Sequence, residues 1–573
     1  MQPVTARKWI LRGELHDSGL AEQLAAELGI QLTTAQILLL RKITTVEMGR
    51  EFLSPKLAAL PDPDLLPDMS IACHRLEQAL LLGEKIAVHG DYDVDGITGC
   101  TLLVEWLRAF GGKVEYHIPL RMKDGYGLSA DAMQRAKDHG CSLVVSVDCG
   151  VSAHAEATLA AELGLDLIIT DHHQPPDTLP DCLALINPHL PTNRFPWKEL
   201  SGVGVAFFLL IGLRRYLREN GYFETRDEPD LRQGLDLVAL GTIADIVPLG
   251  GVNRILVQSG LQRLETGDRP GIAALKRVAD VKSVTSGAVG FRLAPRLNAA
   301  GRLEDAALGV KLLLGEAPDE IDPLAELLDG FNRERQKIEQ QTLAEAIALV
   351  EEQNQPDRHT IVLASENWHS GVIGIVASRL VERYHRPTVM IALENGVGKG
   401  SARSINGFNL YLALKESSSS LSGFGGHAMA AGLSVAVENI ETFIADFEQV
   451  AASILSAEDL VPVSYHDGEV ELSALTLDLL RELETLNPYG AGNPAPVFVS
   501  RNCRVYAPRI LSGKHIKFDV EQGDSKIGCI AFGCAERFDQ LNGSVDLLYR
   551  PGINQWRGTE SVQLQIVDFN PVD

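Results

Sequence analysis

Short apolar runs alternate with longer helical patterns through the first third of the chain. The runs "KIAVHG", "SLVVSVDCG" and "LDLIITDHHQPP" are typical of buried strands, and "TGCTLLVEWLRAFGG" and "SAHAEATLAAELG" between them are typical of helices. Strands that are separated by helices in this way belong to parallel sheets. The alternation therefore predicts an α/β fold built on a parallel sheet.

Beyond this region the pattern changes three times. A long charged stretch at about 321–353, which ends before Pro356, predicts a connecting helix. A second α/β segment follows to about residue 460, and we expect its serine-rich "KESSSSLSGFGGH" to be a mobile loop. The runs "HIKFDV", "KIGCIAFG", "SVDLLYRPG" and "SVQLQIVDF" then indicate a small β-barrel or sandwich. We therefore expect four parts, namely 1–318, 319–355, 356–460 and 461–573.

The chain has the composition of a globular protein of several domains. Its 573 residues exceed what one hydrophobic core usually supports. The stretch "MQPVTARKWILRGELHD" lacks the apolar region of a secretory signal, and the most apolar run, "GVGVAFFLLIGL", is too short to span a bilayer. Eight cysteines without a CxxC pair fit a reducing compartment. We expect a cytoplasmic protein that does not enter a membrane.

The formal net charge of −24 bears on the choice of partner. A strongly acidic protein is a poor general partner for a polyanion, because phosphates are neutralised by lysine and arginine. Binding depends on local patches and on bound cations, however, rather than on the sum of charges. The net charge therefore lowers the expectation of nucleic-acid binding without excluding it.

Acidic and imidazole side chains gather where three of the predicted strands end. "HGDYDVDG" contains the end of the first strand, and "DCG" and "DHH" follow the other two. In open α/β sheets ligands bind outside the carboxyl ends of the strands, so these groups are expected at one edge of the sheet. Carboxylates this close together repel each other unless cations compensate their charge. The candidate residues are His89, Asp93, Asp95, Asp148, Asp171, His172 and His173.

Each cluster taken alone has a simpler interpretation. Aspartate and glycine in "DYDVDG" favour a solvated turn, and "DHH" can cap a helix and continue with surface histidines. The coincidence of three clusters at strand ends favours a metal site instead. Oxygen ligands with a few imidazoles suit manganese or magnesium, whereas structural zinc usually recruits thiolate. We therefore predict a site for two divalent cations, Mn²⁺ or Mg²⁺.

Four segments then occur in an order that resembles the signature motifs of the DHH phosphoesterase superfamily: "HGDYDVDG", "SVDCG", "TDHHQPP" and "LVALGTIADIVPL". Further segments are similar to a bacterial family of exonucleases within it, among them "RMKDGYGLS", "INPH", "LSGVGVAF", "APRLNAAGRL", "WHSGVIGIVASRL", "KGSARSI" and "FGGHAMAAGL". The resemblance implies a 5′ to 3′ exonuclease specific for single-stranded DNA, which releases 5′-mononucleotides in DNA repair and recombination. It also implies that the four parts are a DHH phosphoesterase domain with an N-terminal extension, the connecting helix, a DHH-associated domain and an OB-fold domain.

The resemblance also assigns roles to single residues. Asp171 is implied to orient the histidines, as a carboxylate behind a metal ligand often does, and His173 to face the scissile phosphate. Asp245 enters only through the resemblance, because its sequence context alone favours a helix cap. The implied ligands are His89, Asp93 and Asp148 for one cation, and Asp95, Asp148, His172 and Asp245 for the other.

Hydrolysis of a phosphodiester at two metals accounts for such a ligand set. Cations about 3.5–4 Å apart lower the pKa of a bridging water, hold it in line with the phosphorus, and stabilise charge on the attacking and leaving oxygens. No covalent nucleophile is needed. The ions also compensate the negative charge of their ligands.

Residues that hold the substrate are expected outside the metal site. "FRLAPRLNAAGRL" brings Arg292, Arg296, Asn298 and Arg302 together; surface ion pairs are as good an interpretation as DNA contact by Arg296, Asn298 and Arg302. The resemblance implies that Arg121, Arg403 and His427 receive the 5′ end. In the C-terminal part, basic residues accompany an aromatic ring, as in OB-folds that stack single strands. These residues are Arg501, Arg504, Arg509, Lys514, Lys517, Trp556 and Arg557, of which Trp556 and Arg557 are our DNA-binding candidates.

Two alternatives from other classes remain. One is a DHH-family phosphodiesterase that acts on short oligonucleotides or cyclic dinucleotides, and the other is a non-catalytic DNA-binding scaffold. The additional C-terminal part argues against the first, and the complete ligand set argues against the second. The resemblance suggests single-stranded DNA, single-strand DNA-binding protein and a RecQ-like helicase as partners of a monomer. Because all proposed ligands precede residue 246, a chain ending near Leu460 is expected to keep the metal site.

Overall fold

The structure is a computed structural model of the chain and describes residues 7–14, 18–120, 125–353, 355–394 and 396–572. By their internal contacts the residues form two compact units. The larger unit comprises His16–Asn332 and Arg481–Ala495, and the smaller unit comprises Met1–Leu15, Arg333–Leu480 and Pro496–Asp573.

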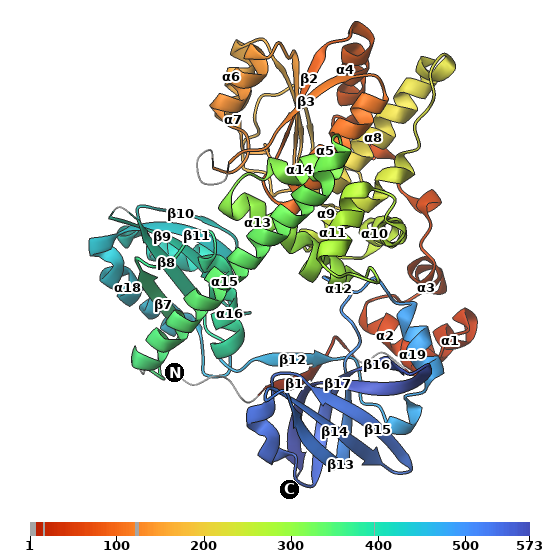
Figure 1. Ribbon diagram of the computed structural model, residues 1–573, viewed down its shortest axis with the longest axis vertical. Coiled ribbons are helices and arrows are strands. Elements are labelled where there is room, and N and C mark those ends of the chain that lie inside the picture. Colours follow the sequence, from red (N-terminus) through yellow and green to blue (C-terminus); the bar gives the residue numbers. More distant parts are fainter. Residues whose placement is uncertain (1–6, 15–17, 121–124, 354, 395, 573) are drawn as a thin grey trace. The chain divides into compact units, whose positions relative to one another are not determined.

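A five-stranded parallel sheet forms the centre of the larger unit (Figure 1). Its strands stand in the order β3–β2–β4–β5–β6, and every neighbouring pair is parallel. The strands β2, β4 and β5 are buried almost throughout, as expected for a parallel sheet with both faces covered. The predicted parallel α/β sheet is confirmed. The strands are β2 (Lys85–Gly90), β3 (Lys113–His117), β4 (Leu143–Val147), β5 (Asp166–Thr170) and β6 (Ala184–Ile186).

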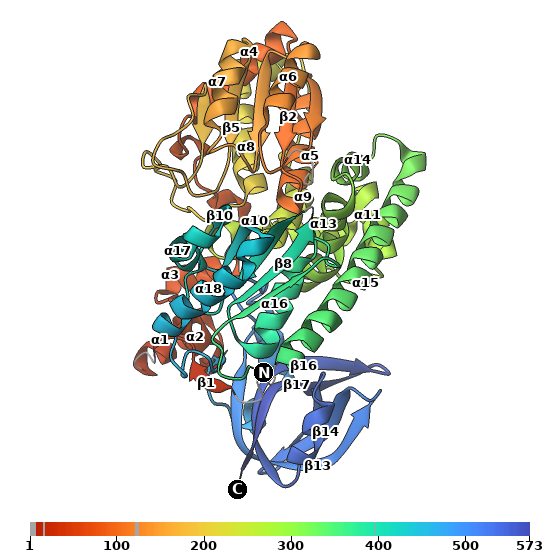
Figure 2. The ribbon, with the colours of Figure 1, turned by 90° about the vertical axis from the view of Figure 1, so that its left-hand side faces the viewer.

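Helices cover both faces of this sheet (Figures 1 and 2). One apolar core joins the sheet to α4, α5 and α8, and a second core joins its other face to α6 and α7. Asp93 starts α5, because its side chain accepts hydrogen bonds from the backbone of Asp95 and Gly96. The helices are α4 (Met69–Leu82), α5 (Val94–Ala109), α6 (Ala130–Asp138), α7 (His154–Glu162) and α8 (Gly202–Glu219).

Further helices extend the apolar core of α5 and α8. Among them, α9 packs on α5, α8 and α10. These helices are α9 (Leu235–Ala244), α10 (Gly251–Thr266), α11 (Pro270–Val278), α12 (Ser286–Ala288), α13 (Ala294–Leu303) and α14 (Ala307–Leu314), with a π-helical turn at Val289–Leu293. Three N-terminal helices, α1 (Ser18–Leu28), α2 (Leu32–Leu40) and α3 (Val46–Leu53), belong to the same unit.

A single long helix, α15 (Ile321–Gln353), begins in the larger unit and continues in the smaller one. Its bounds coincide with the charged stretch that predicted a connecting helix, so this helix is confirmed.

The smaller unit contains a mixed sheet in the order β10–β11–β9–β8–β7, in which only β7 and β8 pair in parallel. Its apolar cores include residues of α16, α17 and α18. The strands are β7 (Ile361–Ser365), β8 (Thr388–Glu394), β9 (Val397–Arg403), β10 (Gly423–Gly426) and β11 (Ala430–Ala436). The helices are α16 (Ile373–Tyr384), α17 (Leu410–Glu416) and α18 (Ile440–Ile454).

The C-terminal strands close into a barrel in the order β13–β14–β15–β17–β16 (Figure 1). This confirms the predicted β-domain and decides between its two forms. The barrel strands are β13 (Phe498–Leu511), β14 (His515–Gln522), β15 (Ser525–Ala531), β16 (Ser544–Trp556) and β17 (Thr559–Val572). A separate parallel pair joins β1 (Lys8–Leu11) to β12 (Val463–His466).

The serine-rich "KESSSSLSGFGGH" is not a loop throughout, so that prediction was wrong. The segment holds the end of α17, a 3₁₀ turn and β10. Two of its serines are buried, and their hydroxyls are satisfied locally: that of Ser417 donates to the Ala413 carbonyl and that of Ser420 donates to the Ser417 carbonyl. Local side-chain to backbone bonds therefore order a stretch whose composition suggested mobility.

Two features of the C-terminal part were absent from the prediction. The helix α19 (Leu477–Glu484) precedes the barrel strands, and residues 481–495 belong to the larger unit. The four predicted boundaries therefore remain predictions.

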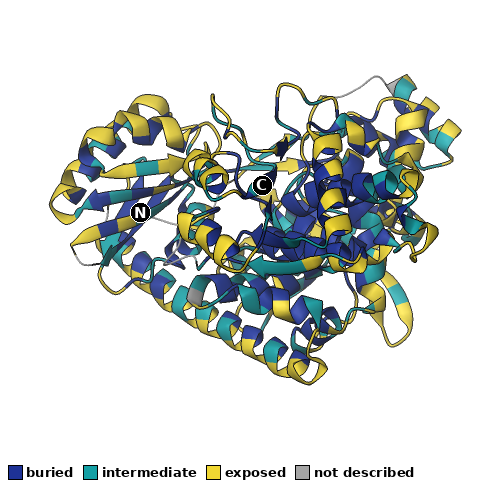
Figure 3. Ribbon diagram, turned by 90° about the horizontal axis from the view of Figure 1, so that it is seen from above, coloured by how far each residue is buried: buried dark blue, intermediate teal, exposed yellow. Residues whose placement is uncertain are grey.

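Buried positions gather in the interior of the fold, and the outward faces of many helices are exposed (Figure 3). No helix among the described residues is long and apolar enough to cross a membrane. All eight cysteines are free thiols.

Candidate metal centre

Three strand ends bring the acidic clusters together at one edge of the parallel sheet. Because β2 lies between β3 and β4, the chain leaves β2 and β4 toward opposite sides of the sheet. Ligands of open α/β sheets bind at such a switch point, outside the carboxyl ends of the strands. The clusters that follow β2, β4 and β5 all lie at this edge, as the sequence predicted.

Asp95 is held by the first turns of two helices. It lies in the first turn of α5, and its carboxylate accepts hydrogen bonds from the backbone amides of Gly202 (2.5 Å) and Val203 (2.9 Å), where α8 begins. Helix N-termini favour a negative charge at this position. Space here is tight, because a Cβ on Gly241 would lie 2.9 Å from Asp95 Oδ1 and 2.3 Å from Thr98 Oγ1. Glycine therefore lets α9 approach the carboxylate.

Asp148 occupies a left-handed backbone conformation directly after β4, with φ of 63°. An aspartate tolerates this conformation better than most residues. Its backbone carbonyl accepts a hydrogen bond from the Tyr126 hydroxyl (3.1 Å). On its other side, a Cβ on Gly202 would lie 2.5 Å from Asp148 Cβ. The packing thus leaves one orientation for a buried carboxylate at this turn.

His172 completes the cluster. Its Nε2 lies 3.1 Å from Asp148 Oδ1, 3.6 Å from Asp245 Oδ2 and 3.8 Å from Asp95 Oδ2. None of these pairs is a hydrogen bond: Asp148 Oδ1, His172 Nε2 and Asp245 Oδ2 are buried and have no hydrogen-bond partner among the described residues. Native proteins rarely leave buried polar atoms unpaired. Two unpaired carboxylate oxygens that lie within 3.6 Å of an unpaired imidazole nitrogen fit bound cations.

The pKa values of the three carboxyl groups show that ionising them all in this site is unfavourable. Burial, followed by the charge of neighbouring aspartates, raises the pKa of Asp95 to about 7 and that of Asp245 to about 9. The same causes raise the pKa of Asp148 well above its ordinary value. Burial also lowers the pKa of His172 to about 4, which keeps its imidazole neutral, the form that binds metal. Bound divalent cations would offset the negative charge of the ionised carboxylates.

Asp171 serves as the anchor of the "DHH" turn. Its carboxylate accepts hydrogen bonds from the backbone amides of Val151, His172 and His173 and from His173 Nδ1 (2.8 Å). Burial alone would raise the pKa of Asp171, but these hydrogen bonds and the His173 charge outweigh it and lower the pKa. The Asp171 carboxylate thus accepts the Nδ1–H of His173, whose Nε2 lies 3.4 Å from the Tyr126 hydroxyl.

Groups of oxygen and nitrogen atoms within 4.8 Å of one another define the possible ligand sets. They are Asp95, His172 and Asp245; Asp148, His172 and His173; and Asp91, Asp93 and Asp148. Carboxylates dominate these sets, as expected for Mn²⁺ or Mg²⁺. The donor set and the unpaired atoms together fit two cations.

Asp91 belongs to one of these groups, but the sequence interpretation did not name it. The signal was present, since Asp91 stands two residues after His89 and two before Asp93. His89, by contrast, is in none of the groups. Its Nε2 donates to the Gly127 carbonyl at 3.0 Å, an arrangement that commonly orients a histidine for binding through Nδ1.

Asp245 is the last residue before the loop that follows α9. It is the C-cap of that helix, and its side chain is 22% exposed. The helix-cap interpretation and the proximity to His172 are therefore both correct descriptions of this residue. The position of Asp245 at the site could not be predicted from the sequence, because it depends on the packing of α9 against α5 in the tertiary structure.

Two of the residues expected at the 5′ end lie at one end of the smaller unit's sheet. Arg403 ends β9 and pairs in register with Ala430, and His427 lies exposed in the turn between β10 and β11. Arg403 Nη1 donates to Ser401 Oγ and to the Ala402 carbonyl. Arg121, the third expected residue, lies outside the described residues.

The arginine-rich helix α13 and the turn before it are used largely for internal contacts. Arg296 donates to Asp329 at 2.9 Å and is 14% exposed, and the Asn298 side chain accepts a hydrogen bond from the Val94 amide at 3.1 Å. Asn298 thereby supports the first turn of α5 beside the metal cluster. The alternative interpretation, an ion pair rather than a DNA contact, describes Arg296, but the pair is largely buried and not at the surface as expected. Arg302 is partly exposed.

Trp556 and Arg557 lie at the tip of the hairpin formed by β16 and β17. Trp556 pairs with Thr559 and is 69% exposed, so only Arg557 and Gly558 form the turn. Both turn residues have positive φ, as a tight hairpin turn requires. An exposed tryptophan beside an arginine can stack on bases. By contrast, Arg501 is committed to Glu469 and Asp546.

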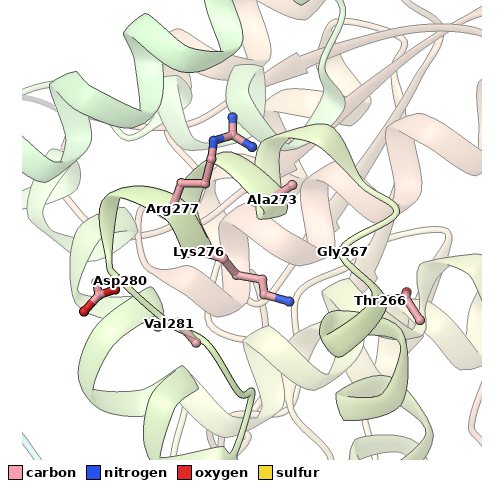
Figure 4. Close-up of a pocket in the computed structure, with 7 residues that line it drawn as sticks. All are labelled: Thr266, Gly267, Ala273, Lys276, Arg277, Asp280 and Val281. Carbon is pink, nitrogen blue, oxygen red and sulfur yellow. The ribbon is translucent and has the colours of Figure 1, made fainter.

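A hollow of about 320 Å³ around Lys276 and Arg277 lies elsewhere in the larger unit (Figure 4). Lys276 Nζ donates to the carbonyls of Leu264 and Glu265 and so caps the end of α10. Arg277 pairs with Asp322. The charged groups of Lys276 and Arg277 thus both have partners within the protein.

Models of three protein families match the chain. The DHH family, N-terminal domain, matches residues 85–242, the DHHA1 domain matches residues 357–453, and the RecJ OB domain matches residues 466–568. The predicted resemblance to the DHH superfamily is confirmed, and the closed barrel is the predicted OB-fold.

Curated relatives are similar along nearly the whole chain. The single-stranded-DNA-specific exonuclease RecJ of Bacillus subtilis is 38% identical over 96% of this chain and 70% of its own length. The protein of the same name from Dickeya dadantii is 42% identical over 91% of this chain and 93% of its own length.

Solved structures agree with the sequence relatives. RecJ of Thermus thermophilus in complex with Mn²⁺ superimposes with a TM-score of 0.85 at 32% identity, covering 99% of this chain and 80% of that one. Its Mg²⁺ complex gives a TM-score of 0.78 at 30% identity, covering 99% of this chain and 79% of that one. Because the likeness in sequence and in fold runs through nearly all of its residues, this chain belongs to the RecJ family.

Proposed function

We propose that this chain is a metal-dependent 5′ to 3′ exonuclease specific for single-stranded DNA, which releases 5′-mononucleotides in DNA repair and recombination. The observation that carries the proposal is that two buried, unpaired oxygens, Asp148 Oδ1 and Asp245 Oδ2, lie 3.1 and 3.6 Å from the equally unpaired His172 Nε2. The chain's membership in the RecJ family indicates which chemistry this site performs.

Two cations, Mn²⁺ or Mg²⁺, fit the donor set. We assign His89, Asp93 and Asp148 to one, with Asp91 beside them, and Asp95, Asp148, His172 and Asp245 to the other. When bound, such a pair activates a water and stabilises charge on the attacking and leaving oxygens of the phosphodiester. Asp148 belongs to both sets, so its left-handed turn places the shared carboxylate.

His173 acts on the substrate phosphate. Burial lowers the pKa of His173, but its hydrogen bond to Asp171 and the surrounding carboxylates outweigh burial and raise it. In the imidazolium form that the raised pKa favours, Nδ1–H is bound to Asp171 and Nε2–H can donate to a phosphate oxygen. Its side chain is 38% exposed, so a phosphate can reach it. Asp171 is thus a positioning residue for this contact.

Polarity requires a group that recognises the 5′ end. Arg403 supplies a guanidinium fork at the end of β9, and His427 supplies an imidazole in the neighbouring turn. We assign them, with Arg121, to the terminal phosphate. Trp556 and Arg557 at the barrel hairpin supply a stacking surface for bases farther along the strand.

The domain limits and the partners belong to the same proposal. We assign 1–318 to the DHH domain with its N-terminal extension, 319–355 to the connecting helix, 356–460 to the DHH-associated domain and 461–573 to the OB-fold domain. Single-strand DNA-binding protein and a RecQ-like helicase are the proposed protein partners of a monomer in the cytoplasm.

The test is digestion of one DNA strand labelled at either end, with Mn²⁺, Mg²⁺ or EDTA present. We expect labelled mononucleotide at once from the 5′ label, late release of the 3′ label, and no product with EDTA. A duplex without single-stranded ends serves as the control and should resist digestion.

A dinucleotide substrate separates the main alternative. Equal or higher kcat/KM on a dinucleotide than on a long strand would contradict the exonuclease and indicate a phosphodiesterase of short oligonucleotides. For the 5′-end site, Arg403→Ala should raise KM for 5′-phosphorylated strands by about 10- to 100-fold, because a charge-assisted hydrogen bond is lost. The same loss on 5′-hydroxyl strands would assign Arg403 to general electrostatics.

A further inference from the structure

The segment between α19 and β13 packs on the loop that follows the Asp245 ligand. We call residues 485–495 the strap. They lie more than two hundred residues beyond Asp245 in the sequence, yet they belong to the same compact unit. Neither the family motifs nor the metal chemistry explains why this segment leaves the barrel unit.

The loop after Asp245 begins in a strained conformation. Ile246 has φ of 63°, which is unfavourable for a β-branched side chain, and its side chain is 73% exposed. Such a conformation persists only where the surroundings hold it. The far end of the loop must therefore be fixed by other contacts.

The strap provides these contacts. The Leu249 amide donates to the Ala491 carbonyl at 2.7 Å, and Leu249 is 2% exposed. A Cβ on Gly490 would lie 2.6 Å from Leu249 Cδ1, and one on Gly492 would lie 2.9 Å from Pro248 Cβ. The loop and the strap thus meet at backbone distance, and two glycines permit the contact.

Arg254 of α10 binds the backbone of the strap. Its guanidinium donates to the carbonyls of Leu486 (3.0 Å), Thr485 (3.3 Å) and Asn487 (2.7 Å) and to that of Phe52 (2.7 Å). The side chain is 2% exposed, and burial lowers its pKa to about 10, so the buried charge is kept at neutral pH. A buried arginine that binds only carbonyls in these contacts is suited to hold backbone in place.

The strap is also closed on itself. Gly490 and Asn493 exchange backbone hydrogen bonds of 2.9 and 3.2 Å, and the Asn493 side chain donates to the carbonyls of Leu486 and Pro488. It therefore presents a preformed turn to the Asp245 loop.

From these contacts we propose that the strap is a positioning element of the metal centre, which holds the Asp245 loop so that Asp245 can bind its cation. This inference rests on the proposed ligand role of Asp245. Groups behind a metal ligand commonly change metal affinity by about 10- to 100-fold when they are removed. A chain ending near Leu460 keeps every proposed ligand but lacks the strap, so it should bind the second cation weakly, contrary to what the order of residues alone suggests.

The experiment is a Mn²⁺ titration of the full-length protein, followed by electron paramagnetic resonance of free Mn²⁺. Asp245→Asn is the reference and should lose one of two binding events. If Asp245→Asn binds Mn²⁺ like the unaltered protein, the ligand assignment within the proposed function is wrong.

Given that reference result, Gly490→Ala should weaken the same binding event by about 10- to 100-fold and leave the other unchanged. The matched control is Gly212→Ala on α8, whose new Cβ would lie 2.8 Å from Met69 Sδ in the same unit without touching the strap. A general loss of stability would weaken both Mn²⁺ binding events alike, whereas loss of the strap contact should weaken only the one that depends on Asp245. Equal Mn²⁺ affinities for Gly490→Ala and Gly212→Ala would overturn the positioning role.

Arg254→Met and Asn493→Ala provide independent variants. Both remove donors to the strap without altering the loop itself. At least one should reproduce the selective weakening of the Asp245-dependent event. Full Mn²⁺ affinity in both folded variants would also overturn the proposal.

Discussion

The larger unit holds aspartates in two kinds of surroundings. Asp329 is 2% exposed and pairs with Arg296. Asp95, Asp148 and Asp245 at the metal centre have no lysine or arginine partner in the described part of the chain, and their pKa values are raised. Removing one partner of a buried ion pair destabilises a fold, whereas clustered carboxyl groups with raised pKa values are typical of a functional site.

The Asp329–Arg296 pair and the metal centre should differ most in their effect on catalysis. Asp148→Asn should lower the rate of DNA hydrolysis by about 10³-fold or more, the scale of a lost central electrostatic contact, while DNA binding stays measurable. Asp329→Asn should leave kcat of the folded protein nearly unchanged. Single-turnover digestion checks both variants, and near-normal turnover of Asp148→Asn would remove this residue from the site.

Stability should respond in the opposite sense. Arg296→Met removes the guanidinium that pairs with the buried Asp329, and breaking a buried ion pair costs up to about 3–5 kcal/mol. Asp245→Asn should instead raise the stability of the metal-free protein, because it removes a carboxyl group that burial disfavours. Urea unfolding in EDTA measures both free energies. A stabilised Arg296→Met would show that the pair is not needed for the fold.

Metal addition separates the two places again. Mn²⁺ at 100 times its dissociation constant should stabilise the unaltered protein by about 2.7 kcal/mol for each site, because only the folded state presents the ligands. The increment should persist in Arg296→Lys and shrink in Asp148→Asn. Thermal melting with and without Mn²⁺ reports the increment, and an unchanged increment in Asp148→Asn would place the cation elsewhere.

Counted per pH unit, the change in stability is the smallest of the expected effects. The pKa values of Asp95 and Asp245 are raised to about 7 and about 9, so the folded metal-free protein binds more protons than the unfolded chain. Its stability should therefore fall as pH rises from about 5 to 9, by up to about 1.4 kcal/mol per pH unit for each such group. Because Mn²⁺ binds the deprotonated groups, the stabilisation by Mn²⁺ should grow over the same range. The melting temperature in EDTA should fall more steeply with pH for the unaltered protein than for Asp245→Asn. Equal slopes for the two proteins would contradict the raised pKa of Asp245.

Several features followed from short stretches of sequence. Apolar runs about five residues long, separated by helical patterns, determined the parallel sheet, and the motifs at their ends determined the clusters around Asp148 and His172. This was possible because a strand and the turn that follows it are encoded by neighbouring residues. The carboxyl ends of parallel strands then necessarily share one edge.

Other features depend on pairs of residues that are distant in the chain. Arg296 of α13 pairs with Asp329 of α15. The Asn298 side chain accepts a hydrogen bond from the Val94 amide at the start of α5, about two hundred residues earlier in the chain. Their chemistry suits DNA contact equally well, so composition could not distinguish the two uses. Asp91 was overlooked because its neighbours His89 and Asp93 carried the motif, and only the geometry shows it near Asp148.

The sequence by itself determined the class of fold, the family, and the strand-end clusters of ligands, because each is written in consecutive residues. Only the tertiary structure decided which arginines are committed to internal partners, how Asp245 reaches His172, and that residues 485–495 pack beside the Asp245 loop. These depend on the packing of α9 across α5 and of Arg254 beneath the strap. Side-chain burial and hydrogen-bond geometry between distant segments have no local signature, since they arise only when the whole chain has folded.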